Sequence, residues 1–191
     1  DFTIVIEVSS KKRDSFIVRF LDKKTFVLFM PEDYESFRKF NFFLKTIFAS
    51  FLLEHKGFIL HASSIRYKNK AIVFAGKEGS GKSTIVKLLP EYTTLNDDFA
   101  IIRKINSSYY VFSSPFYETN PFPKKKSVVP MGRIYFIKQS AVSGVLPIDA
   151  NEAMIKIVGL MLNPLSFIPT AWKDFPTSYQ KDISLRMFEA A

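Results

Sequence analysis

Residues 57–84 of the chain, GFILHASSIRYKNKAIVFAGKEGSGKST, decide the fold. Two apolar segments, 58–67 and 71–76, are separated only by the polar residues Lys-Asn-Lys, a turn short enough to force an antiparallel hairpin. The second segment runs into a glycine-rich loop, and we expect a short helix from about Lys82 to Leu89, closed by Pro90. This unit predicts an α/β fold: a mixed sheet with antiparallel hairpins around a strand-loop-helix core, with helices packed on the sheet.

The loop GKEGSGKS fits the phosphate-binding pattern G-x-x-x-x-G-K-[ST], and it lies between a strand and a helix as that motif requires. Glycine permits the positive φ values and the close approach that let successive backbone N–H groups surround an anion. Lys82 would add positive charge at the β- and γ-phosphates, and the Ser83 hydroxyl would bind Mg²⁺. The sequence therefore predicts a nucleotide site made by Gly76, Lys77, Glu78, Gly79, Ser80, Gly81, Lys82, Ser83 and Thr84.

An acidic pair follows the loop closely, because Asp97 comes 13 residues after Thr84 and Asp98 is next to it. Transport ATPases, helicases and switch GTPases place their acidic residue further on and carry other signatures, which this sequence lacks. Two adjacent carboxylates can divide the work, one binding the metal and the other facing the acceptor. The alternative is an ordinary polar turn between two strands.

The rest of the chain predicts one domain, because 191 residues with 47% apolar side chains are enough for one core. A capping box, Asp149 with Glu152, opens a later helix, and the irregular stretch 113–130 has the length of a lid or binding loop. The predicted parts are an antiparallel β-meander (1–30), an amphipathic helix stopped by Gly57 (37–56), a nucleotide-binding core (57–162) and a C-terminal helix (176–191).

Composition narrows the classes of partner. The net charge of +9 accompanies many Phe, Ile, Lys, Asn and Tyr residues, a mixture that AT-rich codons produce, and no stripe of base-stacking aromatics and arginines favours nucleic-acid binding. The chain has no cysteine, which is typical of a cytoplasmic protein. Lys45 interrupts the longest apolar run, so we expect no membrane span. We also expect the natural chain to start before Asp1.

Taken together, LHASS, the hairpin, AIVFAGKEGSGKST and LNDD resemble the HPr kinase/phosphorylase family and its more distant relative, ATP-dependent phosphoenolpyruvate carboxykinase. The resemblance covers about 57–105 and extends more loosely to 162. It is nearest to small stand-alone members, some of which phosphorylate serine on peptides such as lasso-peptide precursors. It implies a kinase that uses ATP and Mg²⁺ to phosphorylate a serine or threonine of a peptide or small protein. HPr kinases form hexamers, so a homo-oligomer is possible.

The resemblance also implies roles for individual residues. His61 would lie beside the metal and the transferred phosphoryl group, since in these families a histidine precedes the loop by one hairpin. Asp97 would be the general base, and Asp98 the metal-side carboxylate that acts with Ser83. Lys82 would bind the phosphates.

An extra cation often completes such sites, and Arg133, at the start of a strand after the long loop, is the candidate, followed by Arg103. His55 is expected only to cap the helix that ends before Gly57. The family usually carries glutamate where this chain has Thr84, and we find no later glycine-rich segment tied to the reverse reaction. We therefore do not expect phosphorylase activity.

Two other functions stay open. One is a kinase for free serine or another small hydroxylated metabolite, which a small enclosed acceptor pocket would favour. An open groove lined by 113–130 would favour a peptide instead. The other is a nucleotide-binding regulatory module without catalysis, whose bound state changes a partner surface.

Overall fold

The computed structural model describes residues 3–9, 17–20, 25–31, 34–114, 116, 126–162 and 185–187. It divides the chain into two compact units, Asp1–Ile47 and Phe48–Ala191. The boundary falls inside a helix. The predicted helix at 176–191 lies outside the described residues apart from 185–187.

The first unit contains a three-stranded sheet and the beginning of helix α1 (Tyr34–Glu54). Its strands are β1 (Thr3–Ser9), β2 (Ile17–Phe20) and β3 (Thr25–Pro31), in the order β1-β3-β2. β1 pairs in parallel with β3, and only β2 and β3 are antiparallel. This arrangement corrects the predicted antiparallel meander. The alternation of side chains that predicted three strands is the same for parallel and antiparallel partners.

Helix α1 ends at Glu54, two residues before the end that the sequence predicts. Lys56, with φ 55°, adopts the left-handed conformation that closes many helices, and Gly57 is already the first residue of β4. A Cβ on Gly57 would lie 3.0 Å from the Ile102 carbonyl oxygen, so glycine is needed there for close strand packing. His55 caps the helix as predicted, because its Nδ1 lies 2.8 Å from the Phe51 carbonyl oxygen.

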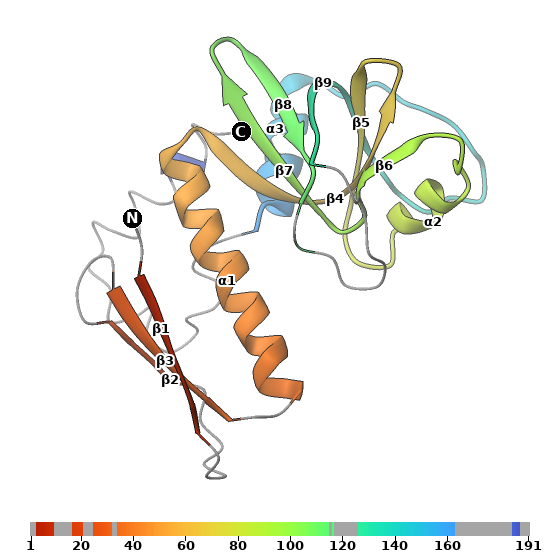
Figure 1. Ribbon diagram of the computed structural model, residues 1–191. Coiled ribbons are helices and arrows are strands. Elements are labelled where there is room, and N and C mark those ends of the chain that lie inside the picture. The colour runs from red at the N-terminus through yellow and green to blue at the C-terminus, as the bar shows by residue number, and fades with distance from the viewer. Residues whose placement is uncertain are drawn as a thin grey trace. The chain divides into compact units, whose positions relative to one another are not determined.

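The second unit is built around a six-stranded mixed sheet (Figure 1). Its strand order is β5-β9-β8-β7-β4-β6, and β4 also pairs with β5. The five strands from β5 to β4 therefore form a closed sheet, and β6 pairs with β4 outside this closed set. β5 and β9 are parallel, and the other pairs are antiparallel. The predicted mixed α/β fold is thus confirmed. The strands are β4 (Gly57–Tyr67), β5 (Lys70–Ala75), β6 (Thr93–Asn96), β7 (Phe99–Ile105), β8 (Ser108–Phe112) and β9 (Val128–Phe136).

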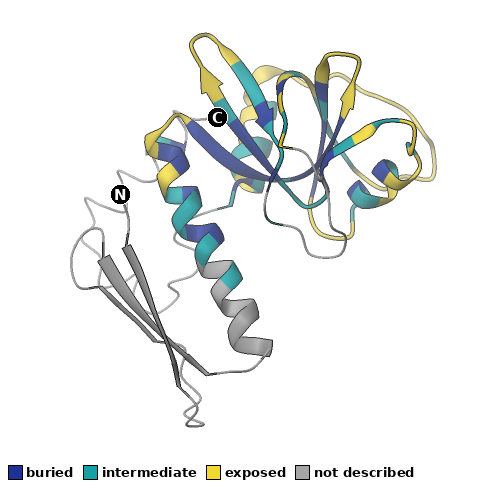
Figure 2. Cartoon of the chain, viewed as in Figure 1, coloured by how far each residue is buried: buried dark blue, intermediate teal, exposed yellow. Residues whose placement is uncertain are grey.

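Helices cover both faces of this sheet. The last turns of α1 pack on Ile59 and Ile101, and α2 (Lys82–Lys87) packs on Ile65 and Phe74. α3 (Ala150–Leu160), which Asp149 caps as predicted, packs on the other side of the sheet. Half of the buried side chains in that cluster are alanine or valine: Ala62, Ala71, Val73, Ala75, Ala100, Val111 and Val129. β4 is the most deeply buried strand (Figure 2). In the described part of the chain, no helix is long and apolar enough to cross a membrane.

The topology brings two loops to the same end of the sheet. β5 and β6 both run antiparallel to β4 and pair with its second half, Ala75 opposite Ala62 and Asn96 opposite Ser64. The glycine loop follows β5 and the acidic turn follows β6. Both loops therefore flank the middle of β4.

Candidate functional site

The glycine loop has the backbone geometry that its sequence predicts. Gly79 has φ 73° and Gly81 has φ 102°, values that other residues rarely adopt. Gly81 stands at the start of α2, and Lys82 is the first residue of that helix. A side chain at Gly79 or Gly81 would strain the loop, although it would meet nothing within 4 Å.

Gly76 is needed for a different reason, which is lack of space. A Cβ there would lie 2.5 Å from Ser80 Oγ, 3.2 Å from Ser80 Cβ and 3.2 Å from the Ile137 carbonyl oxygen. Ser80 Oγ is buried and has no hydrogen-bond partner among the described residues. An unpaired buried hydroxyl costs free energy unless a ligand accepts its hydrogen bond, and a phosphate oxygen is such an acceptor. The loop residues therefore fit a bound phosphate group.

Replacing Gly76 by alanine should lower the affinity for ATP about tenfold, because the loop must move to admit the methyl group. Titration with a fluorescent ATP analogue measures the effect. The matched control is Gly144→Ala, since a Cβ at Gly144 would meet nothing within 4 Å. Equal affinity for the two variants would show that nucleotide binding does not depend on the packing of this loop.

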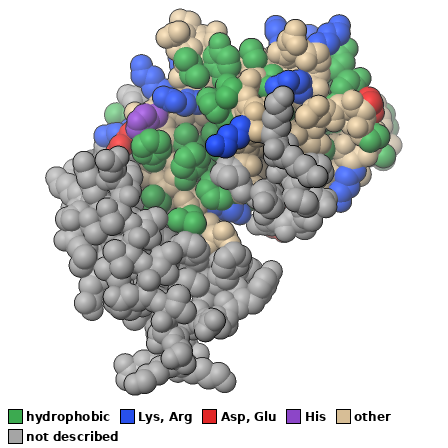
Figure 3. Space-filling view, in the orientation of Figure 1, with side chains coloured by type: hydrophobic (Ala, Val, Ile, Leu, Met, Phe, Trp, Pro, Cys, Tyr) green, Lys and Arg blue, Asp and Glu red, His purple; other side chains and the backbone are tan. Residues whose placement is uncertain are grey.

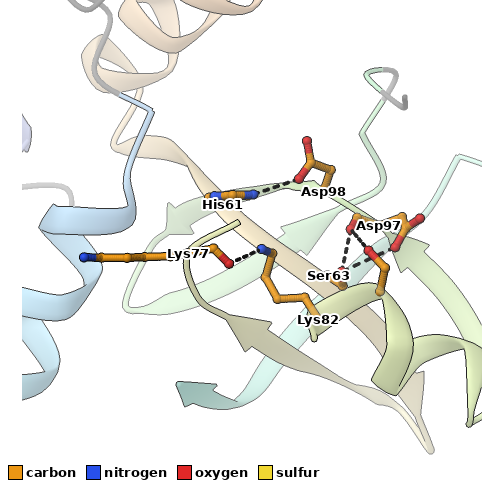
Figure 4. A network of polar contacts seen from close by, with 7 residues as sticks. His61, Ser63, Lys77, Lys82, Asp97 and Asp98 are labelled. Atoms are coloured by element: carbon orange, nitrogen blue, oxygen red, sulfur yellow. Dashed lines mark hydrogen bonds and ion pairs between the residues drawn. The ribbon is translucent and has the colours of Figure 1, made fainter. Parts of the chain in front are cut away.

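Lys82 is the buried cation of the site. The side chain is 5% exposed, and its ammonium donates a hydrogen bond of 2.9 Å to the Lys77 carbonyl oxygen of the loop (Figure 4). Burial lowers the pKa of Lys82, while Asp98, then Glu78 and then Asp97, act in the opposite direction. The ammonium thus lies within electrostatic reach of both predicted site aspartates, and Asp98 acts on it more strongly than Asp97.

The histidine and the acidic turn meet directly. His61 Nε2 lies 2.9 Å from Asp98 Oδ1, and both side chains are about three-quarters buried, at 27% and 26% exposed. Figure 4 shows the two side chains pointing toward each other from β4 and from the turn after β6. The His61 ring also stacks on Phe99, with 5.8 Å between the ring centroids. The structure therefore joins the predicted histidine to one of the two predicted aspartates.

Ser63 is a member of this cluster that the sequence analysis did not single out. Its Oγ donates a hydrogen bond of 2.5 Å to the Asp97 carbonyl oxygen and lies 3.5 Å from Asp97 Oδ1. Ser83 Oγ donates to the same carbonyl oxygen at 3.4 Å. The signal for Ser63 was present, because residues two apart on a strand share one face, and His61 lies two positions earlier. Ser63 and Ser83 together fix the backbone of the acidic turn.

Asn96, just before the acidic pair, holds three elements together. It is 3% exposed, and its Nδ2 donates to Ser64 Oγ at 2.9 Å and to the Phe112 carbonyl oxygen at 3.1 Å. Its Oδ1 accepts a hydrogen bond of 2.6 Å from the backbone N–H of Ser114. Asn96 thus links β4, the end of β8 and the start of the 113–130 stretch, most of which lies outside the described residues.

Replacing Asn96 by alanine should lower the free energy of unfolding by about 2 kcal/mol, because buried groups on three elements lose their partner. Urea unfolding measures the change. Asn151→Ala, on the exposed face of α3, is the matched control and should stay within about 0.5 kcal/mol of the original protein. An Asn96→Ala protein as stable as the control would mean that water replaces the lost hydrogen bonds.

The two candidate arginines lie away from this cluster. Arg133 pairs with Ile72 in the middle of β5, whereas the loop follows Ala75, and the exposed guanidinium is 3.5 Å from the Tyr135 hydroxyl. Arg103 donates a hydrogen bond of 2.9 Å to the His55 carbonyl oxygen, in the turn between α1 and β4. Their positions follow from strand register, which local sequence does not reveal. Gln139 follows β9 in the chain, and its side chain reaches the glycine loop. Its Nε2 donates a hydrogen bond of 2.9 Å to the Gly79 carbonyl oxygen.

The two predicted metal ligands, Ser83 and Asp98, have different contact partners. Ser83 Oγ faces the Asp97 carbonyl oxygen, while the Asp98 carboxylate contacts His61. Within the described ranges, no group of three or more His, Asp or Glu side chains could hold a metal ion. Mg²⁺ commonly takes only one or two protein carboxylates together with substrate phosphates and water, so these two residues fit its donor chemistry.

Figure 3 shows how the positive charge of the described residues is distributed on one face of the protein. On the face drawn in Figure 3, the lysine and arginine side chains of the described residues are scattered among hydrophobic ones and form no continuous stripe. A nucleic-acid groove would need such a stripe along the backbone path.

Comparison with known proteins gives one clear result. None of the curated proteins compared with the chain matches it. The family model of the SynChlorMet cassette protein ScmC matches residues 29–191, which include the glycine loop, the hairpin and the acidic turn. The chain therefore belongs to the family described as SynChlorMet cassette protein ScmC.

Proposed function

We propose that this protein is an ATP- and Mg²⁺-dependent kinase that transfers the γ-phosphoryl group to the hydroxyl of a serine or threonine in a peptide or small protein. One observation carries the proposal: Asp98 contacts His61 and also acts electrostatically on the buried ammonium of Lys82, which bonds to the glycine loop. A loop that merely turned the chain would not need a buried ammonium within electrostatic reach of carboxylates.

The two aspartates are suited to different tasks. Asp98 pairs with His61 and is the carboxylate that acts most strongly on the Lys82 ammonium, so it belongs on the phosphate and metal side. Asp97 does not contact His61 in the described contacts, and Ser63 donates to its carbonyl oxygen and lies 3.5 Å from its Oδ1. We assign Asp97 as the general base and Asp98, with Ser83, as the metal-side ligand.

Bound MgATP would supply the phosphoryl group and a cation that neutralises charge as the group moves. Ser80, Lys82 and the backbone of the loop would bind the phosphates. The acceptor oxygen forms its bond to the γ-phosphorus while the bond from that phosphorus to the β–γ bridging oxygen breaks. The hydroxyl proton passes to the Asp97 carboxylate, and ADP leaves. Such a base need not be strong, because positioning and charge neutralisation dominate this chemistry.

The proposal includes the finer parts of the family resemblance. A hairpin that places a histidine-bearing strand against the loop-bearing strand supports an HPr kinase-like fold. The absence of cysteine, together with the proposed use of ATP, supports a cytoplasmic location. The description of the family as a cassette protein suggests looking for the acceptor among the products of neighbouring genes.

The test is transfer of labelled phosphate from ATP to peptides encoded beside the gene, each compared with a copy in which its serines and threonines are replaced by alanine. We expect phosphate on at least one original peptide and on none of the replaced copies. Free serine is the third acceptor in the assay, and phosphoserine as the main product would identify a metabolite kinase instead. Tight ATP binding without transfer to any acceptor would favour a regulatory module.

A further inference from the structure

An open cavity of about 410 Å³ lies beside the proposed base. It is lined by Val86 of α2, by Tyr92 in the turn after that helix, by Thr93 and Thr94 of β6, and by Asp97. Its described lining residues all lie between Val86 and Asp97.

Asp97 is the residue that the cavity shares with the catalytic cluster. Ser63 of β4 and Ser83 of α2 donate hydrogen bonds to its carbonyl oxygen, and the same residue forms part of the cavity wall. A general base must reach the acceptor hydroxyl. An acceptor bound in the cavity would lie next to Asp97.

We propose that this cavity binds the acceptor, and that the acceptor is an extended peptide segment lying along β6 with its serine or threonine hydroxyl at Asp97. This inference rests on the proposed kinase function and names the substrate site. It adds Thr93, Thr94, Tyr92 and Val86 as residues that contact the acceptor.

The outer edge of β6 favours a peptide over a small metabolite. Among the described strands, only β4 pairs with β6, so within the described part of the chain the other edge of β6 offers backbone groups to an added strand. A peptide paired there would turn alternate side chains toward the cavity. A volume of about 410 Å³ holds a few side chains and greatly exceeds what one free serine would fill.

The lining chemistry agrees with such a segment. Val86 and Tyr92 offer apolar contact area, and the threonine hydroxyls offer hydrogen bonds to a peptide backbone. Lys87, an exposed side chain at the same cavity, adds a positive charge. We therefore expect acceptors with an apolar residue near the hydroxyl and with an acidic rather than a basic neighbour.

A single introduced cysteine can test the site, because the chain has none of its own. Thr93→Cys puts one thiol on the exposed part of the cavity wall, and a bulky maleimide then fills the cavity. We expect the modification to lower kcat/KM for the acceptor peptide at least tenfold relative to the same variant before modification. The affinity for a fluorescent ATP analogue should change less than about twofold.

The matched control is Ser108→Cys, an exposed position at the β7–β8 hairpin, where the same modification should change neither value. In addition, the acceptor peptide should slow maleimide labelling at position 93 but not at position 108. Free serine should slow neither reaction.

The outcomes separate this inference from the proposed function. Transfer that is unaffected by modification at position 93, or an equal loss of ATP affinity, would overturn the acceptor site while the kinase stands. Protection by free serine as strong as by the peptide would replace the peptide with a metabolite. If the unmodified protein binds ATP but phosphorylates no peptide, the proposed function fails, and this site fails with it.

Discussion

Replacing Asp97 by asparagine should lower the rate of phosphoryl transfer by a factor of about 10² to 10⁴, while the affinity for ATP stays within about twofold. Asparagine keeps the size and the backbone of the turn, so the hydrogen bonds from Ser63 and Ser83 to the carbonyl oxygen of residue 97 remain. What disappears is the carboxylate that accepts the hydroxyl proton. Single-turnover transfer from labelled ATP measures the rate, and a separate nucleotide titration measures the affinity for ATP.

Two further variants sharpen this result. Asp98→Asn removes the partner of His61 and the strongest carboxylate acting on Lys82, so it should weaken MgATP binding as well as transfer. Asp149→Asn is the matched control, because asparagine caps the start of α3 as well as aspartate does. If Asp97→Asn keeps full transfer while Asp98→Asn loses it, the roles of the two aspartates are reversed.

Replacing Lys82 by methionine should weaken ATP binding about 100-fold without lowering the free energy of unfolding of the nucleotide-free protein. A charged hydrogen bond to phosphate is worth about 1.5–3 kcal/mol, which gives the size of the loss. Stability is spared because the ammonium is buried and its pKa is lowered by that burial, so its charge is unfavourable in the empty folded protein. Nucleotide titration and urea unfolding at pH 7 measure the two effects.

The same lowered pKa predicts how stability depends on pH. Below the folded-state pKa of Lys82, both folded and unfolded chains hold the proton. Between that pKa and 10.5, the unfolded chain binds more protons than the folded chain, so this group makes stability rise with pH. The contribution should be absent from Lys82→Met, which the difference between the two unfolding curves reveals.

Lys104→Met provides the control for both measurements, because Lys104 is an exposed lysine on β7 at the opposite end of the strand from the acidic turn. We expect the ATP affinity and the pH dependence of that variant to match those of the original protein. A Lys82→Met protein that binds ATP normally would contradict a phosphate site at the glycine loop.

Local patterns were enough to predict the elements around the site. The polar turn at 68–70 predicts the β4–β5 hairpin, and the structure pairs those strands from Ala62 with Ala75 to Tyr67 with Lys70. The helix cap by Asp149 was predicted equally well, with Glu152 N–H donating to Asp149 Oδ1 at 2.9 Å. Turns, caps and glycine positions depend on residues only a few places apart, so the sequence displays them directly.

Features that depend on distant pairing were missed or misplaced. Asn96 reads as one residue of a polar turn, although its side chain holds partners 16 to 32 residues away. Arg133 looked suitable at the start of a strand, but the register of β9 against β5 sets it opposite Ile72, before the loop. The sequence also did not reveal that β1 pairs in parallel with β3, because this pairing joins strands that are distant in the chain.

By itself, the sequence determined that this chain has a glycine loop between a strand and a helix, with a histidine one hairpin before it and two aspartates soon after. Only the tertiary structure decided that His61 meets Asp98, that Ser63 supports Asp97, and that a cavity opens beside that turn. Spacing along the chain records which residues share a turn or a strand face. Which faces and ends meet depends on strand order and register, and these are set by packing of the whole core.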